Sequence, residues 1–273
     1  MSQSETVGKL SLSDHTFEAI LWEIKGHVLE ITLNRPEKKN ALNAVMGIEL
    51  VYALDFAKQA SNIRVVVLGA AGNIFCAGGD LASMGGKTQE TTSTVPKLGE
   101  LSDLALRIRD LCKPFIVKVQ GSVFAGALLL VANASHVVAV KHATFSAPEI
   151  KRGLWPYMVM AGLFRVIPKR VGLDWIMRGY EVDANTAQSW GLINEAVNTE
   201  DLDSAVEKIA SDLTQLPPNT MKLGLEAYNK QESQSFADAL PYLAEMLART
   251  IEEGDAQEGI AAFFEKRKPN WLE

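Results

Sequence analysis

The first part of the chain shows the alternation of hydrophobic and polar residues that is typical of β-strands. It covers 19–24 (AILWEI) and 27–33 (HVLEITL), and Pro36 follows the second run. From Asn43 to about residue 60, apolar residues instead recur at helical spacing, and Asn43 is a suitable N-cap. The pattern predicts an antiparallel hairpin followed by a helix.

Farther along, uninterrupted apolar runs replace this alternation. The β-branched run 64–70 (RVVVLGA) is typical of a strand that is covered on both faces. Similar runs predict strands at 115–121, 136–140 and 192–197, and helical patterns lie at 97–111, 125–133 and 184–190. Strands that alternate with helices at this spacing are joined by right-handed parallel crossovers, so we predict an α/β core over 1–200.

Only helical patterns follow the last predicted strand. They cover 201–213, 219–229, 235–253 and 256–266. A helical region after an α/β core can cap that core or pack on a neighbouring subunit, and the apolar faces of these helices suit either role. We therefore predict a core over 1–200 and a helical region over 201–273.

Composition and charge disfavour several classes of function. The 273 residues include 27 basic and 33 acidic side chains, and the net charge of −6 argues against binding to nucleic acid or to an anionic membrane. The longest apolar run, 123–134, has about 12 residues, whereas a bilayer span needs about 20. Two cysteines, and an N-terminus without an export or transit pattern, favour a cytosolic protein.

Motifs for the common cofactors are absent from the sequence. It has no GxGxxG after a predicted strand, no GxSxG and no HExxH, and its four histidines lack metal-ligand spacing. The GGKT at 85–88 lacks the earlier glycine that a phosphate-binding P-loop requires. Dinucleotide, serine-hydrolase and metal chemistry are therefore all disfavoured.

Two turns that contain glycine follow buried strands. They are FCAGGDL at 75–81 and GSVFAGA at 121–127. Ligands of open α/β sheets collect at the carboxyl ends of strands, and glycine lets a backbone N–H approach a ligand closely. Two such turns can direct two amides at one carbonyl oxygen, which makes an oxyanion hole. The alternative is that these glycines serve only tight turns and packing.

Five motifs in register give these turns a family context. They are ITLNRPEKKNALN (31–43), FCAGGDL (75–81), VQGSVFAGALL (119–129), ATFSAPEIKRGLWP (143–156) and FFEKRKPNW (263–271). In order and spacing they resemble the crotonase, or enoyl-CoA hydratase/isomerase, superfamily from about residue 17 to the end. The resemblance implies a spiral of ββα units with a C-terminal helical region for trimerisation or capping. It also implies an acyl-CoA thioester substrate, no separate cofactor, and a trimer or dimer of trimers.

The resemblance assigns roles to individual positions. The amides of Gly79 and Gly126 match the family's oxyanion-hole donors, which stabilise the charge of a thioester enolate. The carbonyl of Ala77 matches the acceptor of the adenine amino group. Glu149 matches one of the two catalytic glutamates of hydratases, and burial can raise the pKa of such a carboxyl toward neutrality. The alternative is a glutamate that caps a helix or pairs with the basic residues at 151–152.

One position departs from the hydratase pattern. Hydratases carry a second glutamate where this chain has Leu129, and leucine cannot activate water. A double-bond shift needs only one base, which takes a proton from C2 and returns it at C4, so Glu149 alone could serve. We therefore expect a cofactor-independent isomerase that converts a 3-enoyl-CoA into the 2-enoyl form. Hydration of a 2-enoyl-CoA, as in β-oxidation, is the second hypothesis, and a non-catalytic acyl-CoA binder is the third.

Further residues are assigned by their place in the motifs. Candidates for contacts with CoA phosphates or adenine are Lys38, Lys39, Phe263, Lys266 and Lys268. The alternative is that these side chains are only solvated or packed. Candidates for the lining of the acyl pocket are Trp155, Pro156, Tyr157, Met158 and Met160. The alternative is that they belong to the core. Asp80 can orient the first glycine turn, but we favour a cap on a short helix at 81–84. Ser135 stands where the family usually has an aspartate, and we expect this change to be structural.

Overall fold

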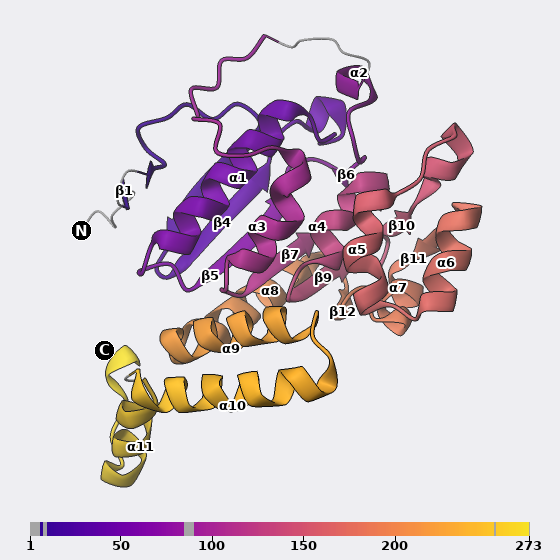
Figure 1. Cartoon of the computed structure of the whole chain (residues 1–273). Coiled ribbons are helices and arrows are strands. Elements are labelled where there is room, and N and C mark those ends of the chain that lie inside the picture. The colour runs from indigo at the N-terminus through magenta and orange to yellow at the C-terminus, as the bar shows by residue number, and fades with distance from the viewer. Residues whose placement is uncertain (1–5, 8–9, 85–89, 254, 273) are drawn as a thin grey trace.

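The computed structural model describes residues 6–7, 10–84, 90–253 and 255–272 (Figure 1). The GGKT segment at 85–88 lies outside the described residues, as do the first five. No helix in the described part of the chain is long and apolar enough to cross a bilayer.

Two β-sheets form the centre of the molecule. The six-stranded long sheet contains β3 Ile20–Lys25, β4 Val28–Leu33, β5 Val65–Ala70, β7 Phe115–Val119, β9 His136–Val140 and β12 Glu195–Val197. The four-stranded short sheet contains β6 Ile74–Cys76, β8 Ser122–Phe124, β10 Thr144–Ser146 and β11 Glu181–Asp183. A separate pair near the N-terminus consists of β1 Thr6–Val7 and β2 Leu10–Ser11.

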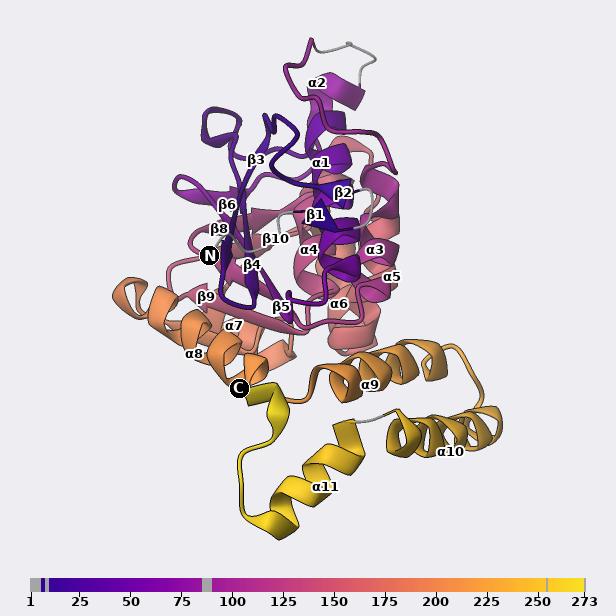
Figure 2. The same cartoon turned by 90° about the vertical axis from the view of Figure 1, so that its left-hand side faces the viewer.

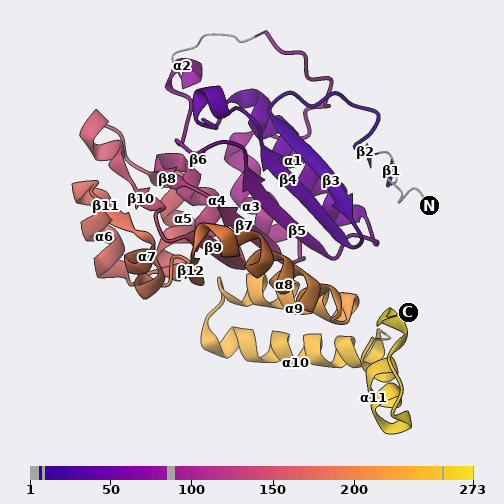
Figure 3. The same cartoon turned by 180° about the vertical axis from the view of Figure 1, so that it is seen from behind.

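Helices surround both sheets. The α-helices are α1 Ala44–Gln59, α2 Leu81–Met84, α3 Leu104–Asp110, α4 Leu128–Ala132, α5 Tyr157–Val166, α6 Lys169–Arg178, α7 Ala184–Trp190, α8 Leu202–Thr214, α9 Pro218–Gln231, α10 Phe236–Glu252 and α11 Asp255–Glu265. Short 3₁₀ helices are η1 Pro36–Lys38, η2 Leu101–Asp103, η3 Ala125–Ala127, η4 Pro148–Arg152, η5 Thr199–Asp201 and η6 Asn270–Leu272. Figures 1 and 3 show α1 and α3 on one face of the long sheet and α8 on the other.

The chain winds as a spiral of two strands and a helix. Each of β5, β7 and β9 in the long sheet leads into β6, β8 or β10 in the short sheet, and a helix follows each pair. Successive turns of the spiral lie side by side, so the long sheet is parallel except for β3 with β4, and the short sheet is parallel except for β10 with β11. The predicted α/β fold class and the spiral are confirmed.

The predicted hairpin and first helix are also confirmed. Strands β3 and β4 pair antiparallel over six residues each, and Gly26 at their turn has a φ of +59°, which glycine adopts without strain. Helix α1 begins after Asn43, whose side-chain oxygen accepts a hydrogen bond from the Met46 amide at 2.9 Å. This bond satisfies one of the amides that a helix leaves unpaired at its start.

Some elements were missed because their sequence carries no period. The strands of the short sheet have only three residues each, which is too few for alternation to be recognised. Helix α5 (YMVMAGLFRV) is apolar at almost every position, so its sequence shows no polar face, although only Val159, Gly162 and Leu163 are buried. The helix predicted from residue 97 begins only at η2 and continues as α3, because 90–100 is an irregular, largely exposed segment.

The C-terminal helices differ in how they meet the core. Helix α8 packs on β5, β7 and β9, and its apolar residues belong to the main core. Helices α9, α10 and α11 lie outside the main core (Figure 2). Leu223, Ala227 and Met246 form a separate small hydrophobic cluster among them. Large apolar residues of α10 and α11 that are more than half exposed are Phe236, Leu240, Leu247, Ile260, Phe263 and Phe264. The division at residue 200 and a trimerisation role for 201–273 stay predictions.

Candidate active site

A cavity of about 830 Å³ opens where β6 and β8 end. Its wall contains Gly79, Gly126, Leu129 and Glu149, so the fold brings three of the sequence motifs to one place. Apolar side chains make up much of the remaining wall, including Leu42, Leu81, Leu101, Phe124, Trp155 and Val159. A largely apolar cavity with a few polar groups suits a small-molecule ligand.

The two glycine turns follow strands of the short sheet rather than of the long sheet, which corrects the sequence-based expectation. Strands β6 and β8 are parallel neighbours, so the turns at their ends lie side by side. A Cβ atom placed on Gly78 would lie 3.1 Å from the Gly126 nitrogen, and one placed on Gly126 would lie 3.5 Å from the Gly79 nitrogen. The short sheet therefore sets the distance between the two amides.

The loop at 77–80, which we call the oxyanion loop, pairs with the segment 39–42. The Leu42 amide donates to the Gly78 carbonyl at 2.8 Å, and the Asp80 amide donates to the Leu42 carbonyl at 2.9 Å. These bonds use the groups on either side of Gly79, while no carbonyl or side chain in the described chain accepts from the Gly79 amide itself. That amide is free to donate into the cavity.

The Gly126 amide also has no hydrogen-bond partner among the described residues, for a different reason. Gly126 lies in the first turn of η3, where amides have no partner within the helix. Ala125 just before it has a φ of +53°, a left-handed conformation that costs a non-glycine residue about 1–3 kcal/mol. Strain of this kind concentrates at functional sites. The cavity thus has two unpaired amides at close range, an arrangement that can stabilise an oxyanion.

Glu149 is the half-buried carboxyl group of this cavity. It lies in the first turn of η4, and its Oε2 atom is buried without a hydrogen-bond partner among the described residues. Among the ion pairs of the described residues, none within 4.0 Å joins Glu149 to Lys151 or Arg152, so the alternative of a salt-bridged glutamate is not observed there. Desolvation raises the pKa of Glu149, against smaller effects of its own backbone amide and the Arg152 charge. A buried carboxylate oxygen without a hydrogen-bond partner is costly for folding, and such groups are typical of functional sites.

Four of the five acyl-pocket candidates line the cavity: Trp155, Pro156, Tyr157 and Met158. Tyr157 and Met158 are 74% and 51% exposed, so they form part of the rim. Met160 lies outside the wall, but its sulfur accepts a hydrogen bond from the Trp155 indole at 3.1 Å. Met160 therefore holds the orientation of a residue in the wall.

The candidates for CoA contacts are split between two places. Lys39 and Ala77 line the cavity, whereas Lys38 in η1 does not. Phe263 is 79% exposed on α11, and Lys266 follows directly after that helix. Helix α11 lies at the opposite end of the molecule from β6 and α2 (Figure 1). A single chain therefore does not bring Phe263 and Lys266 to the cavity.

Sequence reasoning missed two cationic groups in the wall. Lys151 and Arg152 are exposed and line the cavity beside Glu149. The signal was the basic pair in EIKRG, in a chain whose net charge is −6. Both are placed to attract a polyanionic ligand.

The remaining candidates have structural roles. Asp80 caps α2, since its Oδ1 accepts from the amides of Ala82 at 3.1 Å and Ser83 at 3.4 Å, as predicted. The Ser135 hydroxyl bonds both backbone groups of Phe115 at 3.0 Å. A second cavity of about 490 Å³, between α3, α5 and α9, contains none of the catalytic candidates. Among the described residues, no cluster of three His, Cys, Asp or Glu side chains could hold a metal ion, and cofactor independence stays a prediction.

Comparisons with known proteins agree with the geometry. The enoyl-CoA hydratase/isomerase family model matches residues 23–273. The chain is 30% identical to the mitochondrial enoyl-CoA hydratase domain-containing protein 3 of Xenopus laevis, over 98% of this chain and 91% of that protein. It is 31% identical to a mevalonyl-coenzyme A hydratase of Aspergillus fumigatus, over 90% and 91%.

A solved structure extends this likeness to the fold. The enoyl-CoA hydratase of Mycobacterium smegmatis superposes with a TM-score of 0.86 and 29% identity, over 94% of this chain and all of that one. The name of the Xenopus relative places that protein in mitochondria, so the cytosolic location of this chain stays a prediction. From the match over 23–273 and the shared fold, the chain belongs to the enoyl-CoA hydratase/isomerase family of the crotonase superfamily.

Proposed function

We propose that the protein converts a 3-enoyl-CoA into a 2-enoyl-CoA, with Glu149 as the single acid–base group. The observation that carries this proposal is Leu129, which is 4% exposed and lines the cavity at the position of the second hydratase glutamate. Within the described wall, the other carboxylate is Glu181, which is exposed on the edge strand β11. The wall thus favours a reaction that needs one half-buried base.

The proposed reaction moves one proton and one double bond. The Glu149 carboxylate removes a proton from C2, and the electron pair of that C–H bond moves toward the thioester carbonyl to form an enolate. The amides of Gly79 and Gly126 donate hydrogen bonds to its oxygen. Glu149 then returns the proton at C4, and the double bond moves from C3–C4 to C2–C3. A pKa raised by desolvation makes Glu149 a stronger base and lets it hold the proton between the two steps.

Binding of the CoA part is proposed to involve a second copy of the chain. The Ala77 carbonyl, Lys39, Lys151 and Arg152 are at the cavity of one chain. Phe263 and Lys266 are not, and α10 and α11 expose large apolar side chains that a neighbouring subunit could cover. We infer a homotrimer, or a dimer of trimers, in which α11 of one subunit supplies the adenine and phosphate contacts of the next.

A shared site between subunits predicts the mass of the oligomer and a loss of acyl-CoA affinity in a variant of α11. We expect light scattering after size exclusion to give three or six chains, because a monomer would leave the apolar side chains of α10 and α11 exposed. Phe263→Ala should weaken acyl-CoA binding by about tenfold, the loss of a stacked aromatic contact. Exposed Tyr228→Ala, on α9, is the matched control. A monomer that binds acyl-CoA with unchanged affinity after Phe263→Ala would contradict the shared site.

Hydration of a 2-enoyl-CoA is the second candidate. It is favoured by the names of the relatives, which include a mevalonyl-coenzyme A hydratase. Glu181 would then be the carboxylate available to assist Glu149. A non-catalytic acyl-CoA binder is the third candidate, and Leu129 motivates it as well.

Purified protein assayed with two substrates distinguishes these candidates. We expect a 3-enoyl-CoA to give the conjugated 2-enoyl thioester at least about tenfold faster than crotonyl-CoA is hydrated, a barrier difference of about 1.4 kcal/mol. The absorbance of the conjugated thioester rises as isomerisation forms it and falls as hydration consumes it. Faster hydration would make the protein a hydratase. Tight binding of both thioesters without turnover of either would make it a binding protein.

A further inference from the structure

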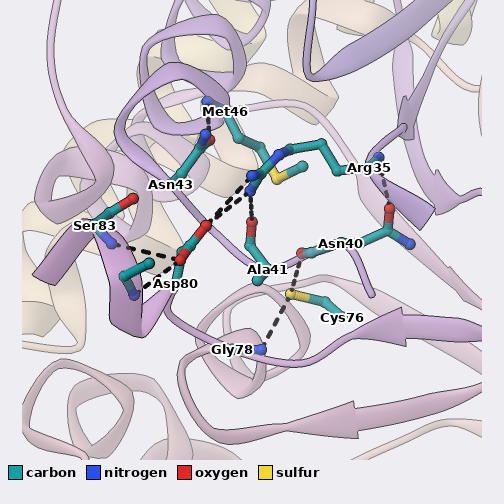
Figure 4. Close-up of polar contacts among 10 residues, drawn as sticks. Arg35, Asn40, Ala41, Asn43, Met46, Cys76, Gly78, Asp80 and Ser83 are labelled. Atoms are coloured by element: carbon teal, nitrogen blue, oxygen red, sulfur yellow. Dashed lines mark hydrogen bonds and ion pairs between the residues drawn. The ribbon is translucent and has the colours of Figure 1, made fainter. Parts of the chain in front are cut away.

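The oxyanion loop rests on a buried arginine that takes no part in the proposed chemistry. Arg35 is 9% exposed and follows β4 closely. Its two terminal nitrogens lie 3.3 Å from Asp80 Oδ2, and one of them also donates to the Ala41 carbonyl at 2.6 Å. Figure 4 shows the contacts of the guanidinium group with both acceptors. Arg35 therefore bonds both the oxyanion loop and the segment 39–42 that pairs with it.

The segment 39–42 has a backbone that needs such support. Lys39 and Asn40 both have a φ of +52°, a left-handed conformation that is uncommon for residues other than glycine. The Asn40 side chain is fully buried, accepts from the Arg35 amide at 2.8 Å and donates to two backbone carbonyls at 2.8 and 3.0 Å. The Cys76 thiol donates to the Asn40 carbonyl at 2.9 Å (Figure 4). These bonds hold 39–42 in a fixed shape.

We infer that Arg35 and Asp80 form a positioning pair that sets the direction of the Gly79 amide. Asp80 directly follows Gly79, and its carboxylate bonds Arg35 through Oδ2 and the start of α2 through Oδ1. Both side chains are 11% exposed, so water is poorly placed to replace the ion pair. The inference rests on the proposed function, because it assigns the pair to the donor of the oxyanion hole.

The chemistry of arginine fits this task better than that of lysine. A guanidinium group is planar and presents several N–H donors in a fixed fork, so it can bond a carboxylate and a carbonyl at once. A lysine has one terminal nitrogen and a flexible stem. Arg35→Lys should therefore keep the charge while loosening the geometry, which separates positioning from simple charge.

The test compares full-length variants in two measurements. We expect Arg35→Gln and Asp80→Asn to lower kcat about 10- to 100-fold with KM changed less than about threefold, because a donor displaced by a fraction of an ångström stabilises the enolate poorly. Arg35→Lys should fall between these variants and the wild type. The double variant should be no slower than the slower single variant, because both remove the same pair.

The second measurement does not depend on turnover. Infrared difference spectra of a bound saturated acyl-CoA, labelled with ¹³C at the thioester carbonyl, report hydrogen bonding to that oxygen. We expect the wild type to lower the carbonyl stretching frequency on binding, and Arg35→Gln and Asp80→Asn to lose most of that shift. Asp80→Asn keeps the volume and the oxygen that caps α2, so it tests the pair even if Arg35→Gln does not fold.

Arg107→Gln is the matched control. It removes another partly buried arginine–aspartate pair, Arg107–Asp55 at 3.4 Å, which links α3 to α1 outside the cavity wall. Its kcat and carbonyl shift should stay at the wild-type values. Wild-type kcat and a full carbonyl shift in Asp80→Asn and Arg35→Lys would overturn the inference. A wild type that shows the shift without turnover would instead refute the proposed reaction, while loss of the shift in the variants would still support the positioning pair.

Discussion

Glu149→Gln is expected to lower kcat for isomerisation by about 10³-fold, which is within the range that a positioned general base contributes. Glutamine keeps the size of the side chain but can neither accept the C2 proton nor return it at C4. KM should change little, because Glu149 is one small part of a cavity of about 830 Å³. Stopped-flow or steady-state absorbance of the conjugated thioester measures the loss. A variant that keeps more than about a tenth of the wild-type kcat would contradict the mechanism.

The same residue predicts the pH dependence of the wild type. Catalysis needs the carboxylate form, and desolvation raises the pKa of Glu149 above its ordinary value of 4.5. We therefore expect kcat/KM to fall as the pH drops through a value above 4.5, rather than below it. Glu181→Gln is the matched control, since Glu181 is the exposed carboxylate of the same wall, and its profile should be unchanged.

The pH dependence of native stability tests the raised pKa of Glu149 independently of activity. The native state binds the Glu149 proton more tightly than the unfolded chain, so native stability decreases as the pH rises from 4.5 through the native pKa. Glu149→Gln removes this loss. The variant should have the higher melting temperature at neutral pH, and its advantage should vanish as the pH falls below 4.5. This result would also show that the inactive variant is folded.

Gly78→Ala is expected to lower kcat by about 10²-fold, the effect of losing one oxyanion-hole donor. The φ of Gly78 is +90°, and an added Cβ would lie 2.6 Å from the Ala125 Cβ and 2.8 Å from the Phe124 carbonyl oxygen. Such contacts force the two turns apart, so at least one amide moves away from the shared oxyanion position. Steady-state kinetics with a 3-enoyl-CoA measures the loss.

Gly26→Ala is the control for this variant. Gly26 also has a positive φ, +59°, but an added Cβ would meet no atom within 4 Å, and the residue lies in the β3–β4 turn. Backbone strain should cost both variants about 1–2 kcal/mol of stability, and Gly78→Ala should lose more because its Cβ also overlaps Ala125 and Phe124. Only Gly78→Ala should lose activity. If both variants keep wild-type kcat, the close approach of the two turns has no part in catalysis.

Local patterns explain which features could be predicted from sequence. The β3–β4 hairpin and helix α1 follow from periodicity over 6 to 16 residues, and the Asn43 cap follows from side-chain chemistry beside its own helix. Strands β5, β7 and β9 follow from β-branched runs that tolerate burial on both faces. The motif around Glu149 indicated a carboxyl in an apolar environment, and its burial without an ion partner agrees with that.

What the sequence determined by itself was the long sheet, its helices, and the residue types at two glycine turns and one glutamate. The tertiary structure alone decided that the turns lie side by side, because β6 and β8 are three-residue strands that pair only once the spiral has formed. The tertiary structure also decided that the Gly79 amide has no partner among the described residues. The segment 39–42, which lies 35 or more residues earlier in the chain, bonds the backbone groups on either side of Gly79 instead. Hydrogen-bond partners so distant leave no periodic signal, and the placement of Phe263 outside the cavity is likewise a property of the folded chain.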